Sequence, residues 1–222
     1  MLISYIMSNF ILEPVQIDFK EFIPYIGEKQ MKVHYNGHYM KYIANFNKLL
    51  ESDSKLKKIY CEVKKTTVEE HFKKSLLLLI VELFDKNSDI VHNTAQIYNH
   101  ELYWKTIVSS EKSIHMLCNI KNKLFDSHET FSSFYNKFIN EGIKHFGSGW
   151  LWLIFVNNKL DIITTHDAII PYTEQILGVI DLWEHSYYLD YESERKKYLE
   201  NMFKMINWTK IYSKISLISL KN

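Results

Sequence analysis

The residue pattern changes at Phe146-Gly147-Ser148-Gly149, and this change restricts the chain to folds that join helices to a sheet. With only six glycines and three prolines in 222 residues, the part before the change has few residues that break helices. Four segments of it carry apolar residues at three-and-four spacing, which is typical of amphipathic helices. They are residues 34–50, 68–84, 93–108 and 132–145. The first two-thirds of the chain is therefore predicted to be a layer of helices.

Beyond the change, two runs of aromatic and β-branched residues, 150–156 and 160–165, are separated by Asn157-Asn158-Lys159. Asparagine tolerates the positive φ that tight hairpin turns require, so the two runs are predicted to form a β-hairpin. A third apolar run, 176–182, would complete a small antiparallel sheet, and residues 192–206 return to helical spacing. Helices followed by a short three-stranded sheet and a further helix indicate an α+β fold.

Composition argues against several classes of partner. The 27 basic and 26 acidic side chains give a formal charge of +1, so no nucleic-acid or membrane partner is predicted. The longest apolar stretch, 76–83, is too short to cross a bilayer. Cys61 and Cys118 lie far apart and are predicted to be reduced thiols. The first twelve residues carry no Lys or Arg, so a cytoplasmic location is predicted, although a missing start would allow mitochondria or another organelle.

Spacing makes four side chains candidates for a site. His34 and His38 stand four residues apart, as do Asp181 and His185, and on a helix or tight turn each pair can face the same way. Either pair on its own is more often an ordinary core or surface pair than a set of metal ligands. The pairs therefore need support from the residues around them.

That support comes from four segments that match one protein family in the family's own order. They read HYNGHYMKY at 34–42, QIYNHELYW at 96–104, GSGW at 147–150 and DLWEHSYYLDY at 181–191. Together they resemble the iron/manganese superoxide dismutases, and the last segment is close to the most specific signature of that family. The resemblance extends over nearly the whole chain, from about residue 12 to residue 208.

The resemblance implies a metal site and a reaction. The implied ligands of one metal ion per subunit are His34, His100, Asp181 and His185. Three imidazoles and one carboxylate suit iron or manganese. The implied activity converts superoxide to oxygen and hydrogen peroxide by redox cycling of iron, with manganese as the alternative metal. The residues implied to be catalytic are His38 and Tyr42, which line the substrate channel, and Gln96, which donates its amide to metal-bound solvent.

The position of this glutamine distinguishes the two branches of the family. Iron-type members carry it four residues before the second ligand histidine, and manganese-type members supply it from the sheet region. Here Gln96 lies four residues before His100, and Ala168 occupies the corresponding sheet position. The resemblance therefore favours the iron branch.

The resemblance also implies what surrounds the metal. It divides the chain into a helical hairpin domain at 1–108 and an α+β domain at 109–222, with the metal site between them. Trp104, Trp150 and Trp183 would wall the site, or would simply pack the core. Glu184 and Tyr188 would bridge a homodimer, or would be a surface carboxylate and a packed ring. Arg195 would support the substrate channel, or would be an ordinary surface charge.

The chain departs from the family pattern at two places. Between Tyr42 and Gln96 it is longer than expected by roughly 20 residues, and an extended loop is predicted there, with an error in the predicted gene product as the alternative. Within this region the charged stretch 52–65 is predicted to be exposed and poorly constrained, or simply a solvated face. Gly37 and Tyr39 stand where many members have Lys and His, which removes a positive charge that would attract superoxide.

These departures leave two alternatives to an active dismutase. One is a metal-binding family member with weak or lost dismutase activity that serves as a scaffold or metal reservoir. The other is a helical interaction protein in which the ligand-like residues are relics.

Overall fold

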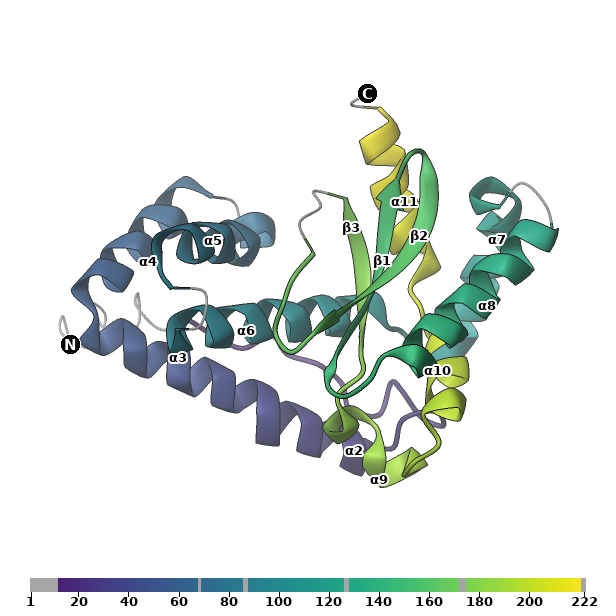
Figure 1. Ribbon diagram of the computed structural model, residues 1–222, viewed down its shortest axis with the longest axis horizontal. Coiled ribbons are helices and arrows are strands. Elements are labelled where there is room, and N and C mark those ends of the chain that lie inside the picture. Colours follow the sequence, from purple (N-terminus) through teal and green to yellow (C-terminus); the bar gives the residue numbers. More distant parts are fainter. Residues whose placement is uncertain (1–11, 68, 86–87, 126–127, 172–174, 221–222) are drawn as a thin grey trace. The chain divides into compact units, whose positions relative to one another are not determined.

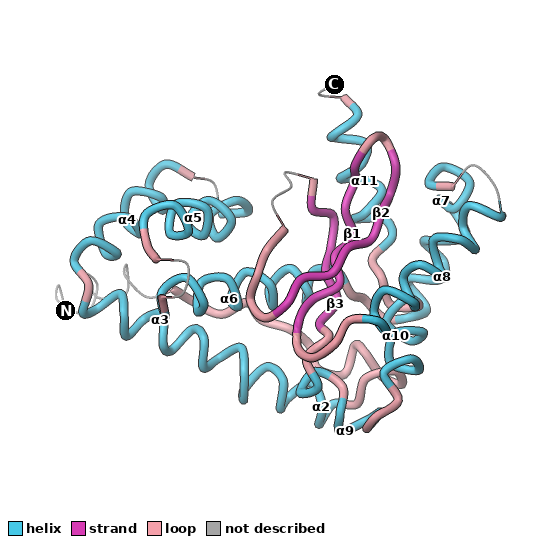
Figure 2. The backbone as a smooth tube through the Cα atoms, viewed as in Figure 1, coloured by secondary structure: helices cyan, strands magenta, loops and turns pink. Residues whose placement is uncertain are grey.

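The computed structural model describes residues 12–220 apart from 68, 86–87, 126–127 and 172–174. The chain forms two compact units, of which the first comprises Met1–Gln16 and Tyr35–Glu101 and the second Ile17–His34 and Leu102–Asn222. The helices of the first unit and the small sheet of the second are shown in Figure 1, and Figure 2 colours them by type. The apolar N-terminal stretch before residue 12 and Val68, where one predicted helix begins, lie outside the described residues.

The first unit is built from helices that bury one apolar face each. A π-helical turn, η1 (Tyr35–Tyr39), leads into α3 (Met40–Ser52), and α4 (Ser54–Thr66), α5 (Glu69–Leu83) and most of α6 (Asp89–Thr106) follow. The buried residues recur three or four positions apart, as an amphipathic helix requires. They include Ile43, Phe46 and Leu50 of α3, Leu56, Ile59, Tyr60 and Val63 of α4, and Leu76, Leu77 and Ile80 of α5.

The extra segment between Tyr42 and Gln96 is helical, so the prediction of an extended loop is wrong. Asp53 caps the first turn of α4 by accepting a hydrogen bond from the Leu56 N–H at 2.9 Å. Tyr60 of the same helix is buried, with its ring 6.4 Å from that of Phe46. Lysines exposed on the opposite face of α4 conceal this periodicity in the sequence. The charged stretch 52–65 is thus a solvated face of a packed helix and not a poorly constrained region.

The second unit contains a three-stranded antiparallel sheet in the order β2-β1-β3. Its strands are β1 (Gly149–Val156), β2 (Lys159–His166) and β3 (Ile176–Asp181), and β1 is buried from Gly149 to Phe155. Asn157 and Asn158 take φ of 51° and 59°, which confirms the predicted hairpin. The register pairs Trp150 with Asp181, so a carboxylate stands at the end of β3. The predicted α+β fold is confirmed.

Helices complete the second unit. They are α2 (Glu28–His34), α7 (Ser110–Leu124), α8 (His128–Lys144), a 3-10 turn η2 (Glu184–Ser186), α9 (Tyr188–Tyr191), α10 (Arg195–Phe203) and α11 (Trp208–Ser219). The sequence patterns did not predict α7. Within the described part of the chain, no helix combines the length and apolar character needed to span a membrane.

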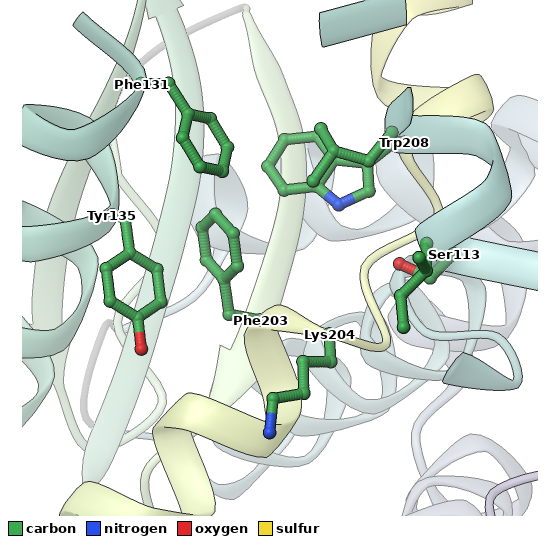
Figure 3. A pocket seen from close by; sticks show the side chains of 8 residues that line it. Ser113, Phe131, Tyr135, Phe203, Lys204 and Trp208 are labelled. Atoms are coloured by element: carbon green, nitrogen blue, oxygen red, sulfur yellow. The ribbon is translucent and has the colours of Figure 1, made fainter. Parts of the chain in front are cut away.

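An aromatic cluster joins three of these helices. The ring of Phe203 lies 4.9 Å from Tyr135, 5.2 Å from Trp208 and 6.0 Å from Phe131, measured between ring centroids. Figure 3 shows these side chains around a pocket, with Ser113 of α7 at its edge. Because the rings come from α8, α10 and α11, Phe203 is the side chain that holds the cluster together.

We expect Phe203→Ala to lower the free energy of unfolding by about 3–5 kcal/mol, because it removes a side chain that is 4% exposed and leaves a cavity. Denaturant unfolding followed by circular dichroism measures this change. Leu217→Ala, at a side chain that is 61% exposed, is the matched control and should change stability by about 0.5 kcal/mol or less. Equal effects of the two substitutions would contradict the central role of Phe203.

Candidate metal centre

The centre is organised around Asp181, the last residue of β3, whose side chain is fully buried. Its two carboxylate oxygens have separate partners. Oδ1 accepts a hydrogen bond from the Trp183 N–H at 2.8 Å. Oδ2 lies 3.0 Å from His34 Nε2 and 3.7 Å from His185 Nε2. The backbone hydrogen bond thus orients the carboxylate so that one oxygen faces two imidazoles.

Aromatic rings hold the two imidazoles nearest to Asp181. His34 ends α2 and is fully buried, with its ring 4.8 Å from Trp104 in an edge-on arrangement. His185 lies on η2, where its ring is 5.0 Å from His34 and 5.5 Å from Trp183. These contacts leave the rings little freedom to turn away from Asp181. They also surround the polar atoms with apolar surface that excludes water.

Gln30 is a supporting residue that the sequence patterns did not identify. It is fully buried one helical turn before His34. Its Nε2 donates to the His185 backbone oxygen at 2.7 Å, and its Oε1 accepts from the Leu189 N–H at 3.0 Å. Both ends of one amide therefore tie α2 to the segment that carries His185. The spacing of four residues from His34 was the available signal, because residues i and i+4 share a helix face.

His100 lies on α6 and is oriented by its own helix. Its Nδ1 is 2.7 Å from the Gln96 backbone oxygen, so Nδ1–H donates this hydrogen bond. A neutral imidazole then keeps the lone pair of Nε2 for a metal ion. A backbone acceptor on the second nitrogen is the usual support of a metal-bound histidine.

The structure brings three of the four predicted ligands together within the second unit, where Asp181 Oδ2 faces the Nε2 atoms of His34 and His185. Ligand atoms bound to a single ion at about 2.1 Å would lie roughly 3.0–4.2 Å apart, so the two separations around Asp181 suit an ion. His100, the fourth ligand that the resemblance implies, belongs to the first unit. The donor set of three imidazoles and one carboxylate fits iron or manganese.

Comparison with known proteins identifies the family. The model for the alpha-hairpin domain of iron/manganese superoxide dismutases matches residues 9–108, and the model for their C-terminal domain matches residues 116–214. The chain belongs to the iron/manganese superoxide dismutase family. The family resemblance of the four motifs is thereby confirmed.

Curated members of this dismutase family resemble the chain over most of its length. A protein of Plasmodium falciparum named superoxide dismutase (Fe) is 34% identical over 83% of this chain and 85% of its own. One of the same name from Entamoeba histolytica is 32% identical over 83% and 88%. A superoxide dismutase (Mn/Fe) of Rickettsia conorii is 33% identical over 90% of each chain.

The three residues that the family resemblance implies to be catalytic lie on three elements of the first unit. Tyr42 of α3 places its ring 5.4 Å from that of His100. Gln96 is 4% exposed on α6, one turn before His100. His38 lies in the π-helical turn η1 and does not belong to the ligand cluster. Turns of this kind are frequent at functional sites because they change which residues face a common side.

Arg195 is a structural clamp in this dismutase, and the alternative of an ordinary surface charge is wrong. Its guanidinium donates to the Tyr187 hydroxyl at 3.0 Å and to the backbone oxygens of His145, Gly147 and Leu182 at 2.6, 3.1 and 3.1 Å. These bonds join the turn before β1 to the segment after β3. Arg195 therefore stabilises the loop in which Trp183 and His185 lie.

The remaining predicted residues occupy two kinds of surroundings. Trp150 is fully buried in β1, and Trp183 is half-buried beside His185. Glu184 is exposed, and the Tyr188 side chain is 48% exposed. Trp150 thus belongs to the core, whereas Glu184 and Tyr188 have surface available for a partner.

Proposed function

We propose that this chain is a superoxide dismutase that converts superoxide to oxygen and hydrogen peroxide at an iron ion held by His34, His100, Asp181 and His185. The observation that carries this proposal is the geometry of Asp181. Its carboxylate is fully buried, and Oδ2 faces the Nε2 atoms of His34 and His185 at 3.0 and 3.7 Å. A buried carboxylate surrounded by imidazoles is costly unless a cation compensates its charge.

Bound iron would supply the one-electron redox chemistry. The chain's own residues have supporting tasks. Asp181 balances the positive charge of the ion, and Trp104 and Trp183 keep bulk water from the histidines. The Gln96 amide, buried one turn from His100, would hydrogen-bond to bound solvent, and the Tyr42 hydroxyl would hold a proton near the incoming superoxide.

A direct assay tests this function against the metal-reservoir alternative. Protein loaded with iron should contain about one iron per subunit and catalyse dismutation in proportion to its iron content, whereas metal-free protein should be inactive. Stoichiometric iron without dismutation would favour the reservoir. Protein that retains no iron after loading would favour the interaction protein with relict ligands.

We also propose that the enzyme is a homodimer formed by the surface around Glu184. Support comes from large apolar side chains exposed in the second unit, among them Phe146 at 90% and Leu189 at 51%. Phe146, Trp183, Glu184 and His185 line one hollow. Exposed apolar surface next to polar groups is characteristic of a protein interface. The resemblance to the family implies that the Glu184 carboxylate contacts His185 of the partner subunit. Each subunit's His185 would then have one carboxylate from the other subunit beside it.

Glu184→Ala should weaken the dimer and lower iron content in the same variant. The reason is that a buried imidazole N–H would lose its acceptor, at a cost of about 1–3 kcal/mol per site. Analytical ultracentrifugation combined with metal analysis measures both effects. Glu111→Ala, at an exposed carboxylate on α7, is the matched control. A tight, fully iron-loaded and fully active Glu184→Ala dimer would remove Glu184 from the interface.

A further inference from the structure

Glu101 is a buried carboxyl group that follows the ligand His100 directly in sequence. Its side chain is 4% exposed, and its Oε1 accepts a hydrogen bond from the Tyr39 hydroxyl at 2.6 Å. This is the short distance expected when a carboxylate accepts from a hydroxyl. Burial of a carboxyl group costs stability unless such partners compensate it. The hydrogen bond to Tyr39 therefore holds the first residue after His100 in a defined position.

Tyr39 is fully buried and connects three elements of the first unit. Its hydroxyl has one proton, which goes to Glu101, and its oxygen accepts the Val15 N–H at 3.0 Å. Burial, with a further contribution from Glu101, raises the pKa of Tyr39 far above 10, so the hydroxyl keeps its proton in neutral solution. Tyr39 thus links the segment at Val15, the π-helical turn η1 and helix α6.

The Tyr39 ring also contacts the ligand itself. It is nearly parallel to the His100 ring, with an interplanar angle of 27° and a centroid separation of 6.1 Å. On its own helix, His100 is held by the bond from Nδ1 to the Gln96 backbone oxygen. The hydrogen bond to Gln96 holds the His100 imidazole against its own helix, and the neighbouring Tyr39 ring limits how far the imidazole can tilt. The position of the Tyr39 ring depends in turn on its bonds to Glu101 and Val15.

We propose that Tyr39 and Glu101 are a pair of positioning residues that orients His100 toward the metal ion. The hydrogen bond between them keeps the Tyr39 ring in contact with the His100 ring. It also holds the backbone of Glu101, the residue that follows His100, in place. The inference rests on the proposed iron site but not on the rate of dismutation. Its signature is the geometry of the ferric centre and the retention of iron.

Three substitutions separate the hydrogen bond from its surroundings. Tyr39→Phe removes the donor and keeps the ring. Glu101→Leu removes the acceptor, whereas Glu101→Gln keeps an acceptor oxygen of nearly the same shape. We expect Tyr39→Phe and Glu101→Leu to change the electron paramagnetic resonance spectrum of the ferric protein and to release iron to a chelator about tenfold faster. Glu101→Gln should retain the wild-type spectrum and rate within about twofold.

Tyr35→Phe is the matched control for loss of a buried phenol. Its hydroxyl donates to the Val15 backbone oxygen at 2.6 Å, and it lies on the same π-helical turn as Tyr39. It should lower thermal stability to a similar degree as Tyr39→Phe while leaving the ferric spectrum unchanged. The double variant Tyr39→Phe/Glu101→Leu should be no worse than the more severe single variant, because both lose one shared interaction.

The outcomes distinguish this inference from the proposed function. Wild-type protein without iron would contradict the iron site itself. Iron-loaded Tyr39→Phe with the wild-type spectrum and release rate would overturn the positioning pair alone. The positioning pair would also be overturned if Tyr35→Phe altered the ferric spectrum as strongly as Tyr39→Phe does. A general loosening of the π-helical turn would then explain the effects of both substitutions. Equal damage from Glu101→Gln and Glu101→Leu would show that the hydrogen bond is not the important feature.

Discussion

Asp181→Ala is expected to abolish stable iron binding and, with it, dismutation. The substitution removes the one anionic ligand of the cluster and leaves His34 and His185 facing a gap that water can enter. Loss of a direct ligand should lower metal affinity by more than the roughly 10–100-fold that is typical for supporting residues. Metal analysis after dialysis against a chelator, with dismutation measured on the same samples, provides the test. His185→Ala should behave in the same way, because it removes another of the ligands.

The control for charge is Asp161→Asn, at a partly exposed carboxylate of β2 that pairs with Lys137. It lies on the same sheet as Asp181 but outside the ligand cluster. Iron content and dismutation should remain at the wild-type level. Stoichiometric, chelator-resistant iron in Asp181→Ala would mean that the ligand set is wrong.

Iron-loaded protein should be at least about tenfold more active per bound metal than manganese-loaded protein, because the residues around the metal tune the potential to suit one of the two metals. Residues that hydrogen-bond to metal-bound solvent tune both the potential and the acidity of that solvent. Here Gln96 would supply this bond from α6, and Ala168 has no side-chain donor to supply it from the turn after β2. Reconstitution of metal-free protein with each metal, followed by metal analysis and assay, measures the ratio.

Gln96→Ala tests the cause of this preference. It removes the amide and keeps all four ligands, so both metals should still bind while the ratio of their activities changes. Equal or greater activity of the manganese-loaded wild type would place the chain outside the iron branch. An unchanged ratio in Gln96→Ala would assign the preference to other residues.

The four local motifs implied the proposed ligands through their resemblance to the family, and the apolar residue pattern predicted the strand that ends at one of them, Asp181. The β-hairpin follows from two asparagines that accept positive φ, and the end of β3 follows from the apolar run that stops at Asp181. Three histidines and an aspartate could be proposed as ligands because each stands inside a motif that resembles the family.

Tertiary structure alone decided which side chains support those ligands. Gln30 and His185 are 155 positions apart, and Tyr39 and Glu101 are 62 apart, so no local pattern joins either pair. The helix α4 was obscured for a related reason: its exposed lysines dominate the composition, while four buried residues fix its packing. Hydrogen bonds and burial depend on which surfaces meet when the chain packs. The sequence motifs therefore indicated the proposed metal ligands, whereas the residues that orient these ligands are brought to them only when the chain packs.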